Sequence, residues 1–215
     1  MAKQKDAAPG RRRQPRRRTG AAIVDAVVLA AEKILSEGGP DALTTSRLAK
    51  VSGVSVGSIY QYFESKKAVV GELARRIEKR SIAIMYARLE AVRDKGLPEI
   101  IEALVGALAD RQLGDAEMRK IVQEEVPRSW VRKASDETNS EAQRVVAMII
   151  GEHRDAVRKG DPELMAFILV RAVESAFEGA VSDRPELLTD PGFLGELRHL
   201  VTAYLVHEPH AAGDA

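Results

Sequence analysis

The sequence lacks cysteine, has few aromatic residues and contains no long apolar run. None of its 215 residues is Cys, and Phe, Trp and Tyr together make up 4%. Without Cys there is no disulfide, no cysteine-ligated zinc and no thiol nucleophile, which suits a reducing compartment. The longest uncharged apolar runs fall far short of the roughly 18 residues that a membrane span needs, and no apolar signal-peptide core directly follows the basic N-terminus. We therefore expect a soluble, cytoplasmic protein without membrane association.

The balanced net charge hides a basic N-terminus. The chain has 33 Lys and Arg residues against 32 Asp and Glu residues, for a formal charge of +1. Residues 1–20 hold eight of the basic residues and one acid, whereas residues 71–215 carry a formal charge of −6. A basic arm ahead of a mildly acidic body predicts an acidic polymer as partner at one end only. The alternative is a solvated tail that aids solubility.

The spacing of apolar residues predicts helices along the whole chain. Ile23, Val27, Ala30 and Ile34 recur every three or four residues, and Gly38-Gly39-Pro40 then ends this first helix. No segment alternates apolar and polar residues around a hairpin turn. We therefore expect an all-α fold. Similar patterns between Gly and Pro breaks predict further helices at 45–52, 55–63, 66–94, 98–111, 114–126, 135–159, 162–179 and 193–206.

Residues 45–63 have the organisation of a helix-turn-helix. Two short helical segments flank Gly53, as this motif requires. Small residues on the second helix would let the backbone approach DNA, hydroxyls can bind phosphates, and Val56 can touch a thymine methyl. Phe63 is expected in the core instead. The residues expected to face outward are Ser55, Val56, Gly57, Ser58, Tyr60, Gln61 and Tyr62.

The run from Leu43 to Lys66 resembles the N-terminal DNA-binding domain of TetR-family transcriptional regulators. The matching residues are Leu43-Thr44-Thr45, Leu48-Ala49, Gly53-Val54-Ser55, Gly57-Ser58-Ile59-Tyr60-Gln61-Tyr62-Phe63 and Ser65-Lys66. The similarity covers about residues 20–67. It implies a basic arm (1–18), a three-helix DNA-binding domain (19–66), a helical effector-binding and dimerisation domain (67–207) and a tail (208–215). It also implies a homodimer on a palindromic double-stranded DNA operator, expected to be a repressor that a small hydrophobic effector releases.

The resemblance also implies which residues contact DNA. Thr45 and Lys66 match phosphate-binding positions at the starts of two helices, where the helix dipole favours an anion. Val56 stands where many relatives carry Lys or another polar residue. Arginines just before the first helix can enter the adjacent minor groove or bind phosphate. The implied DNA contacts are Arg16, Arg17, Arg18, Thr45, Ser55, Val56, Gly57, Ser58, Tyr60, Tyr62 and Lys66.

The remainder of the sequence carries no recognisable catalytic or metal motif. His199, His207 and His210 lack the i, i+4 spacing of a helical metal pair, and Glu124-Glu125 has no catalytic partner in the sequence. We expect neither enzyme activity, nor a metal, nor a cofactor. An apolar pocket between helices is expected instead, with Gln123, His153, Arg171 or Glu174 as polar anchors. Its expected lining is Met85, Leu89, Leu104, Met118, Trp130, Met148 and Phe167.

The last two long helices are expected to form the dimer interface. Both have broad apolar faces, and in the resembled family the last two helices of each subunit form a four-helix interface. Small residues would let the helices approach closely. The expected interface residues are Ala172, Ser175, Ala176, Gly179, Phe193 and Leu197.

Two other functions remain open on sequence grounds. The basic arm alone would suit an architectural nucleic-acid-binding protein without ligand control. A small helical enzyme that keeps the helix-turn-helix as a scaffold is the second alternative, although no cluster of acid, base and nucleophile supports it.

Overall fold

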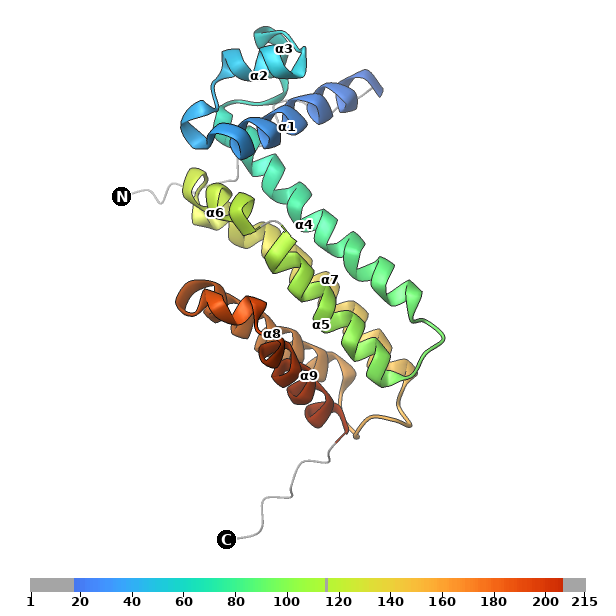
Figure 1. Ribbon diagram of the computed structural model, residues 1–215. Helices are drawn as coiled ribbons and strands as arrows, with labels where there is room; N and C mark the ends of the chain where they lie inside the picture. The colour runs from blue at the N-terminus through green and yellow to red at the C-terminus, as the bar shows by residue number, and fades with distance from the viewer. Residues whose placement is uncertain (1–17, 115, 207–215) are drawn as a thin grey trace, which may run out of the picture. The chain divides into compact units, whose positions relative to one another are not determined.

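The computed structural model of the protein describes residues 18–114 and 116–206, which form helices and no strand (Figure 1). The all-α class expected from the sequence is confirmed. Two short 3-10 helices, η1 (Pro40–Ala42) and η2 (Pro185–Thr189), lie in loops. The α-helices are α1 (Arg18–Gly38), α2 (Thr45–Ser52), α3 (Val56–Tyr62), α4 (Lys66–Ala91), α5 (Leu97–Gly114), α6 (Ala116–Glu125), α7 (Arg128–Glu152), α8 (Pro162–Asp183) and α9 (Pro191–Val206).

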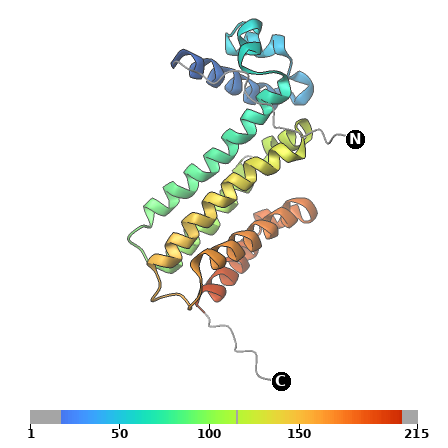
Figure 2. The same cartoon turned by 180° about the vertical axis from the view of Figure 1, so that it is seen from behind.

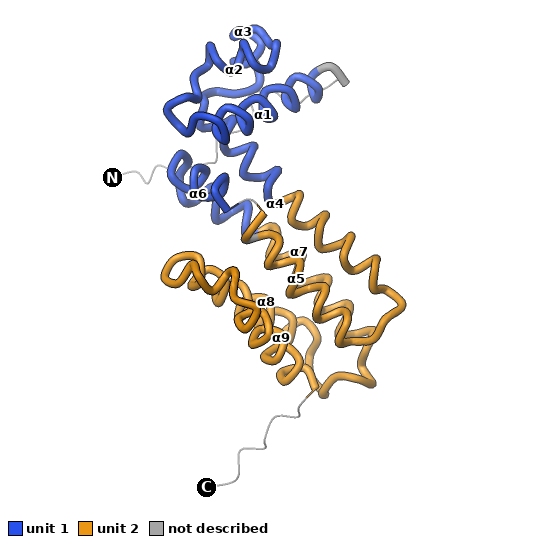
Figure 3. The backbone as a smooth tube through the Cα atoms, in the orientation of Figure 1, with its two compact units in different colours: residues 1–78, 115–136 blue, residues 79–114, 137–215 orange. Residues whose placement is uncertain are grey.

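The chain divides into two compact units, which Figure 3 colours separately. Unit 1 takes the chain up to Glu78 together with residues 115–136, and unit 2 takes residues 79–114 and 137 onward. Helices α4 and α7 therefore each contribute residues to both units. The sequence-based boundary falls at residue 66, whereas the compact unit that holds the helix-turn-helix also includes α6 and the starts of α4 and α7.

Unit 1 is built on a core to which five helices contribute. Val27 of α1, Leu48 of α2, Ile59 of α3, Leu73 of α4 and Val122 of α6 are nearly completely buried in one cluster. Full burial of such a side chain stabilises the fold by about 1.5–3 kcal/mol. The two helices of the helix-turn-helix, α2 and α3, thus share one core with α1, α4 and α6.

Local signals fix the ends of α2 and α3. The Thr44 hydroxyl accepts a hydrogen bond from the backbone N–H of Arg47 at 3.2 Å, and the Ser55 hydroxyl accepts one from that of Ser58 at 3.1 Å. Both are N-caps, which satisfy N–H groups that the helix leaves without partners. Gly53 ends α2 with a φ of 68°, a left-handed conformation that glycine adopts without strain.

Unit 2 contains two adjoining apolar clusters. Ile101 of α5, Phe177 of α8 and Val201 of α9 belong to the larger cluster, where the rings of Phe177 and Phe193 meet edge to face at 5.4 Å. Met85 of α4 and Ile149 of α7 belong to the second cluster, together with residues of α5. Helix α5 contributes to both clusters, and the view from behind in Figure 2 shows α7 in front of it.

The seventh helix differs most from its expected range of 135–159. It begins at Arg128, directly after Pro127, and ends at Glu152. The following loop turns back because it binds the end of α9: the backbone N–H of Arg158 donates to Leu205 O, and its guanidinium Nε donates to Tyr204 O, both at 2.7 Å. These hydrogen bonds replace further helical turns, and no local sequence pattern reports them.

Candidate nucleic-acid interface and ligand cavity

Helix α3 exposes the face that the sequence predicted. Ile59 faces the core at 3% exposure, whereas Val56 and Tyr60 are 40% and 45% exposed. Ser55, Gly57 and Gln61 are exposed too, and Ser58 is half-buried. The outer surface of α3 is therefore small, hydroxylated and uncharged, so a duplex could approach its backbone closely.

Gly57 has open space around it. A Cβ built at this position meets no atom within 4 Å among the described residues, and the backbone has no left-handed conformation that requires glycine. Glycine inside a helix costs roughly 0.5–1 kcal/mol relative to alanine. Neither internal packing nor backbone geometry therefore explains why position 57 lacks a side chain.

Two hydroxyl groups meet where α2 and α3 come together. The Thr45 hydroxyl oxygen lies 3.4 Å from that of Tyr60. Thr45 is the first residue of α2, so its hydroxyl lies beside the N–H groups that open the helix. Tyr62 differs from Tyr60, because it is half-buried and packs against the core of unit 1.

Lys66 begins α4, after Ser65, whose hydroxyl accepts a hydrogen bond from the backbone N–H of Ala68 at 3.3 Å. The Lys66 side chain is 42% exposed, and its Nζ lies 3.5 Å from Oε2 of Glu125 at the end of α6. The sequence did not predict this pairing, since Glu125 lies 59 residues further along the chain. The lysine expected to bind phosphate therefore has a competing carboxylate.

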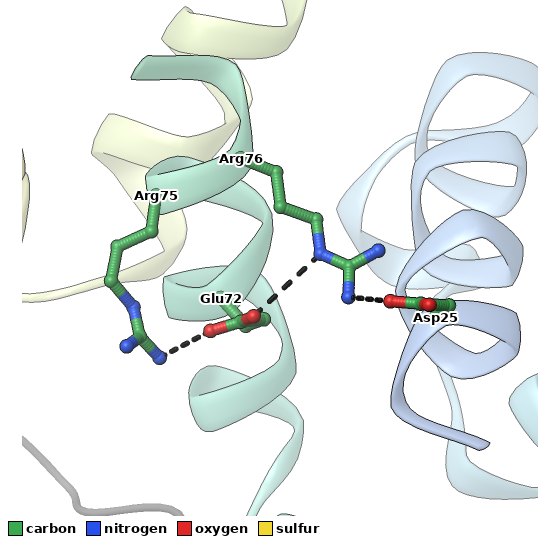
Figure 4. A network of polar contacts seen from close by, with 4 residues as sticks. All are labelled: Asp25, Glu72, Arg75 and Arg76. Carbon is green, nitrogen blue, oxygen red and sulfur yellow. Dashed lines mark hydrogen bonds and ion pairs between the residues drawn. The ribbon is translucent and has the colours of Figure 1, made fainter. Parts of the chain in front are cut away.

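A second ion-pair network connects α1 with α4 (Figure 4). Arg76 Nη2 donates to Asp25 Oδ1 at 2.6 Å, and Arg76 Nε lies 3.6 Å from Glu72 Oε1. Glu72 also pairs with Arg75. Arg76 thereby connects acids on two helices, and this network fixes α1 against the start of α4.

Of the basic arm (1–18), the structure describes only the last residue, Arg18. Arg18 is the first residue of α1, and Arg16 and Arg17 lie outside the described residues. Their expected contacts with DNA stay predictions.

Unit 2 contains a partly open cavity of about 80 Å³. Residues from α4, α5, α7, α8 and α9 line it, and most of them are aliphatic. Met85 and Leu104 of the expected pocket belong to this lining. Leu89 packs against the neighbouring apolar cluster without lining the cavity.

The other four residues expected in the pocket lie elsewhere, which corrects the sequence-based set. Met118 is buried in the core of unit 1, and Trp130 packs there over Gly71, where an added Cβ would come within 3.2 Å of the indole ring. Met148 and Phe167 are 55% and 50% exposed on α7 and α8. Apolar character alone did not tell the cavity-facing side of a helix from its outer side.

A buried ion pair lines the cavity. Arg111 of α5 donates a hydrogen bond to Glu174 of α8, and these residues are 6% and 4% exposed. Glu174 was one of the expected polar anchors, whereas Arg111 was missed. The sequence does indicate that Arg111 faces inward, because Arg111 follows Leu104 and Leu108 at helical spacing on the same apolar face of α5.

The remaining expected anchors do not line this cavity. Gln123 and Arg171 are exposed, and the half-buried His153 has its Nδ1 at 3.0 Å from Ile149 O. Tyr86, beside the cavity-lining Met85 on α4, donates a hydrogen bond to Glu141, and this bond raises the pKa of Tyr86 above its ordinary value.

The residues expected at the dimer interface separate into two sets. Leu197 is buried in the core of unit 2, and Phe193 packs on Phe177 there. Ala172 and Ser175 are exposed on α8, while Ala176 and Gly179 are half-buried. The exposed side of α8 also carries Leu164, Phe167 and Ile168, so Phe167 belongs with this outer face rather than with the cavity.

The described residues contain no group of three or more His, Asp or Glu side chains placed to hold a metal ion. Within residues 18–114 and 116–206, no helix is both long and apolar enough to cross a membrane.

The fold and the exposed α3 define a helix-turn-helix protein with a helical C-terminal part, and sequence comparison identifies its family. Residues 27–73 match the profile described as "Bacterial regulatory proteins, tetR family", and residues 96–205 match "Tetracyclin repressor-like, C-terminal domain". The second match alone covers half of the chain. The chain belongs to the TetR family of transcriptional regulators.

Individual relatives resemble the chain in different parts. The nucleoid occlusion factor SlmA of Actinobacillus pleuropneumoniae is 50% identical over 44 residues, which is 20% of this chain and 22% of that protein. The SlmA protein of Haemophilus ducreyi matches equally. The chain thus spans about a fifth of the length of these curated relatives.

Solved structures resemble the chain over most of its length. A Rhodococcus sp. RHA1 protein of unknown function has a TM-score of 0.64 at 19% identity, covering 91% of this chain and 100% of its own. The fatty acid degradation regulator FadR of Bacillus halodurans has a TM-score of 0.60 at 18% identity, covering 88% and 97%. A TetR-family regulator of Streptomyces coelicolor has a TM-score of 0.57 at 20% identity, covering 85% and 96%. At these identities the similarity shows the fold alone.

Proposed function

We propose that this TetR-family regulator is a cytoplasmic homodimeric repressor. It binds a palindromic operator through α2 and α3 and leaves it when a small molecule occupies the cavity of unit 2. It needs no metal or cofactor and catalyses no reaction. Repression is a simpler mode of regulation than activation, because a protein that occupies a promoter needs no further contact with the polymerase to block it.

The observation that carries the proposal is the exposed, side-chain-free position at Gly57. Internal packing leaves space for a side chain there, so a requirement from outside the protein explains the glycine best. A DNA backbone or base edge approaching α3 is such a requirement. The nearby Thr45 and Tyr60 hydroxyls and the Lys66 ammonium can bind phosphates on either side of the groove.

The outer face of α8 supports the homodimer. Leu164, Phe167 and Ile168 follow the i, i+3, i+4 spacing of one helical face and are each at least 41% exposed. Apolar residues grouped in this way mark interaction surfaces. A second copy of the chain is the partner that a palindromic operator requires, since each copy reads one half-site.

The test is a titration of the protein against the duplex upstream of its own gene and against a shuffled duplex, followed by fluorescence anisotropy at several salt concentrations. We expect the upstream duplex to bind at least about 10³-fold more tightly, as specific regulators do. Deleting residues 1–18 should weaken binding to both duplexes and flatten the salt dependence. Equal affinity for both duplexes with a steep salt dependence would favour the architectural alternative instead. A reporter gene placed behind the upstream duplex tests whether the protein represses or activates transcription. Repression predicts low expression in the presence of the protein and higher expression in its absence.

A further inference from the structure

The cavity of unit 2 has a hydrocarbon wall. Aliphatic residues of five helices line it, among them Ile101, Leu104 and Val173, and none of the described lining residues is aromatic. Packed protein interiors leave few spaces larger than a water molecule. A cavity of this size between core residues is therefore a feature that close packing alone does not account for.

The polar side chains in the wall present almost no polar surface to the cavity. Arg111 and Glu174 pair with each other and, like Ser81 and Thr138, have further interactions within the protein. Arg111 Nε and Glu174 Oε2 have almost no accessible surface, so a ligand in the cavity cannot reach them. The polar lining residues, each between 4% and 6% exposed, are Ser81, Arg111, Thr138, Asn139 and Glu174.

Such a wall disfavours any polar group inside the cavity. A hydroxyl, an amide or an ion that entered would give up its hydrogen bonds to water and find almost none in the wall, which is costly. A bound water molecule likewise needs two to four polar partners. A hydrocarbon group loses no hydrogen bond on entering, and its removal from water is favourable.

The size of the cavity favours a thin hydrocarbon over a ring. Its volume of about 80 Å³ is about half that of the roughly 150 Å³ apolar cavity that holds benzene. The described wall also has no aromatic side chain on which a ring could stack. A linear alkyl chain is thinner, and about three or four of its carbon atoms fill this space. Because the cavity is partly open, the rest of the molecule can stay in water.

We propose that the cavity takes the end of a linear alkyl chain, which the protein selects by length and thickness without a hydrogen bond to it. The polar end of the molecule stays at the open side of the cavity, in water, so its charge contributes little to affinity. That this alkyl compound is the effector rests on the proposed function. Its chemistry rests on the cavity alone.

Two sets of probes test this chemistry at neutral pH, with binding followed by the methyl NMR shifts of the full-length protein. The first set is the linear 1-alkanols from ethanol to octanol. We expect affinity to rise about fourfold per methylene, the equivalent of about 0.8 kcal/mol, and to level off beyond about four carbons. The second set varies the rest of the molecule. Hexanoate and hexylammonium should bind within about tenfold of 1-hexanol, and phenol at least about tenfold more weakly.

Two substitutions in the wall should shift the length dependence in opposite directions. Ala142→Leu adds three carbons at the cavity and should abolish the gain in affinity with chain length. Leu104→Ala removes three carbons from the wall, so affinity should continue to rise to about seven carbons. Filling a cavity is commonly stabilising, so Ala142→Leu carries the test if Leu104→Ala does not fold. Ala87→Leu makes the same change at an exposed position of α4 outside the lining, and it should bind every alkanol like the wild type.

Four results would overturn the proposal: a charged six-carbon probe that differs from 1-hexanol by more than about tenfold, a phenol affinity close to that of 1-hexanol, an unchanged length dependence in Ala142→Leu, or no binding of any alkanol. These titrations contain no DNA. A failure to bind an operator, or to leave it when 1-hexanol is added, would contradict the proposed function and leave the ligand chemistry standing.

Discussion

At the residue scale, Gly57 distinguishes a DNA-contacting role from a structural one. A Cβ at position 57 meets no neighbour within 4 Å in the folded unit, and valine is a slightly better helix former than glycine. Gly57→Val should therefore leave the free energy of unfolding unchanged or slightly raised. On a duplex, the added side chain would separate α3 from the groove, and we expect operator affinity to fall by at least about 100-fold, the loss of about two base contacts.

Gly151 on α7 provides the matched control for this prediction. It is also helical, and a Cβ there also meets open space. Gly151→Val should change neither stability nor operator affinity appreciably. Anisotropy titrations of both variants measure operator affinity, and urea unfolding measures the free energy of unfolding. If Gly57→Val binds the operator with wild-type affinity, α3 does not contact DNA.

The second prediction at this scale concerns the carboxylate beside Lys66. Glu125 competes with a DNA phosphate for this lysine. Partly exposed ion pairs contribute about 0.2–1 kcal/mol, so Glu125→Gln should raise operator affinity about two- to fivefold. The adjacent Glu124→Gln makes the same change in net charge without touching the pair. Equal effects of the two variants in anisotropy titrations would show that only overall charge matters.

Single residues of unit 1 could be predicted wherever a local rule applied. Phe63 was expected in the core and is 1% exposed, and the Gly53 break lies where the turn needs a left-handed residue. Tyr60 and Tyr62 looked alike in the sequence, yet only Tyr60 is freely exposed. The pairing of Lys66 with Glu125 could not be predicted, because it depends on where α6 packs.

At the scale of elements, Arg158 holds the loop after α7 against the C-terminal end of α9. Its guanidinium binds Tyr204 O and lies 4.5 Å from the centre of the Tyr204 ring. A cation at a helix C-terminus also compensates the carbonyls that the helix leaves without partners. Arg158→Ala should therefore lower the free energy of unfolding by about 1–2 kcal/mol.

Urea unfolding at a fixed protein concentration measures this change, since a dimer's stability depends on concentration. Arg154→Ala removes an exposed arginine from the same loop and should cost under about 0.5 kcal/mol. If both variants unfold like the wild type, the loop does not anchor α9.

Helix starts were predicted well where an N-cap residue marks them. The segments 45–52 and 162 onward begin as expected, because Thr44 and Asp161 are N-caps and Pro162 opens α8. The end of α7 was expected seven residues too late. Contacts between distant segments, here those of Arg158 with α9, decide such ends, and periodicity contains no information about them.

At the scale of the whole molecule, the exposed face of α8 carries the prediction of a dimer. Phe167→Glu places a charge in the centre of this apolar face, where a partner subunit would have to bury it. We expect a monomer in sedimentation at micromolar concentration. Operator affinity should fall at least about 100-fold, because the helix-turn-helix of a single subunit contacts only one half-site.

Met148→Glu is the control, since Met148 is equally exposed on α7 but outside the proposed interface. It should remain dimeric and bind the operator normally. Phe193→Asp would be a poorer test of the interface, because Phe193 belongs to the internal core of unit 2. If the Phe167→Glu protein is still a dimer, the exposed face of α8 is not the dimer interface.

The sequence predicted the architecture of the molecule better than its binding surfaces. Resemblance in residues 20–67 pointed to the family, and helical periodicity pointed to the fold. Of the residues expected in the pocket, only Met85, Leu104 and Glu174 line the cavity of unit 2, because its lining depends on which faces of the helices turn inward. Phe167 illustrates this: its apolar side chain suited a pocket and a dimer face equally, and only its exposure separates them.

Selection from a pool of random duplexes tests the central claim, dimeric and sequence-specific DNA recognition through α3, most directly. The wild-type protein should enrich one palindromic sequence whose half-sites are separated by about 34–36 Å or a multiple of it, so that both recognition helices enter major grooves on one side of the duplex. Gly57→Val should enrich nothing in the same selection. A wild-type protein that binds the pool without enriching any sequence would contradict the claim.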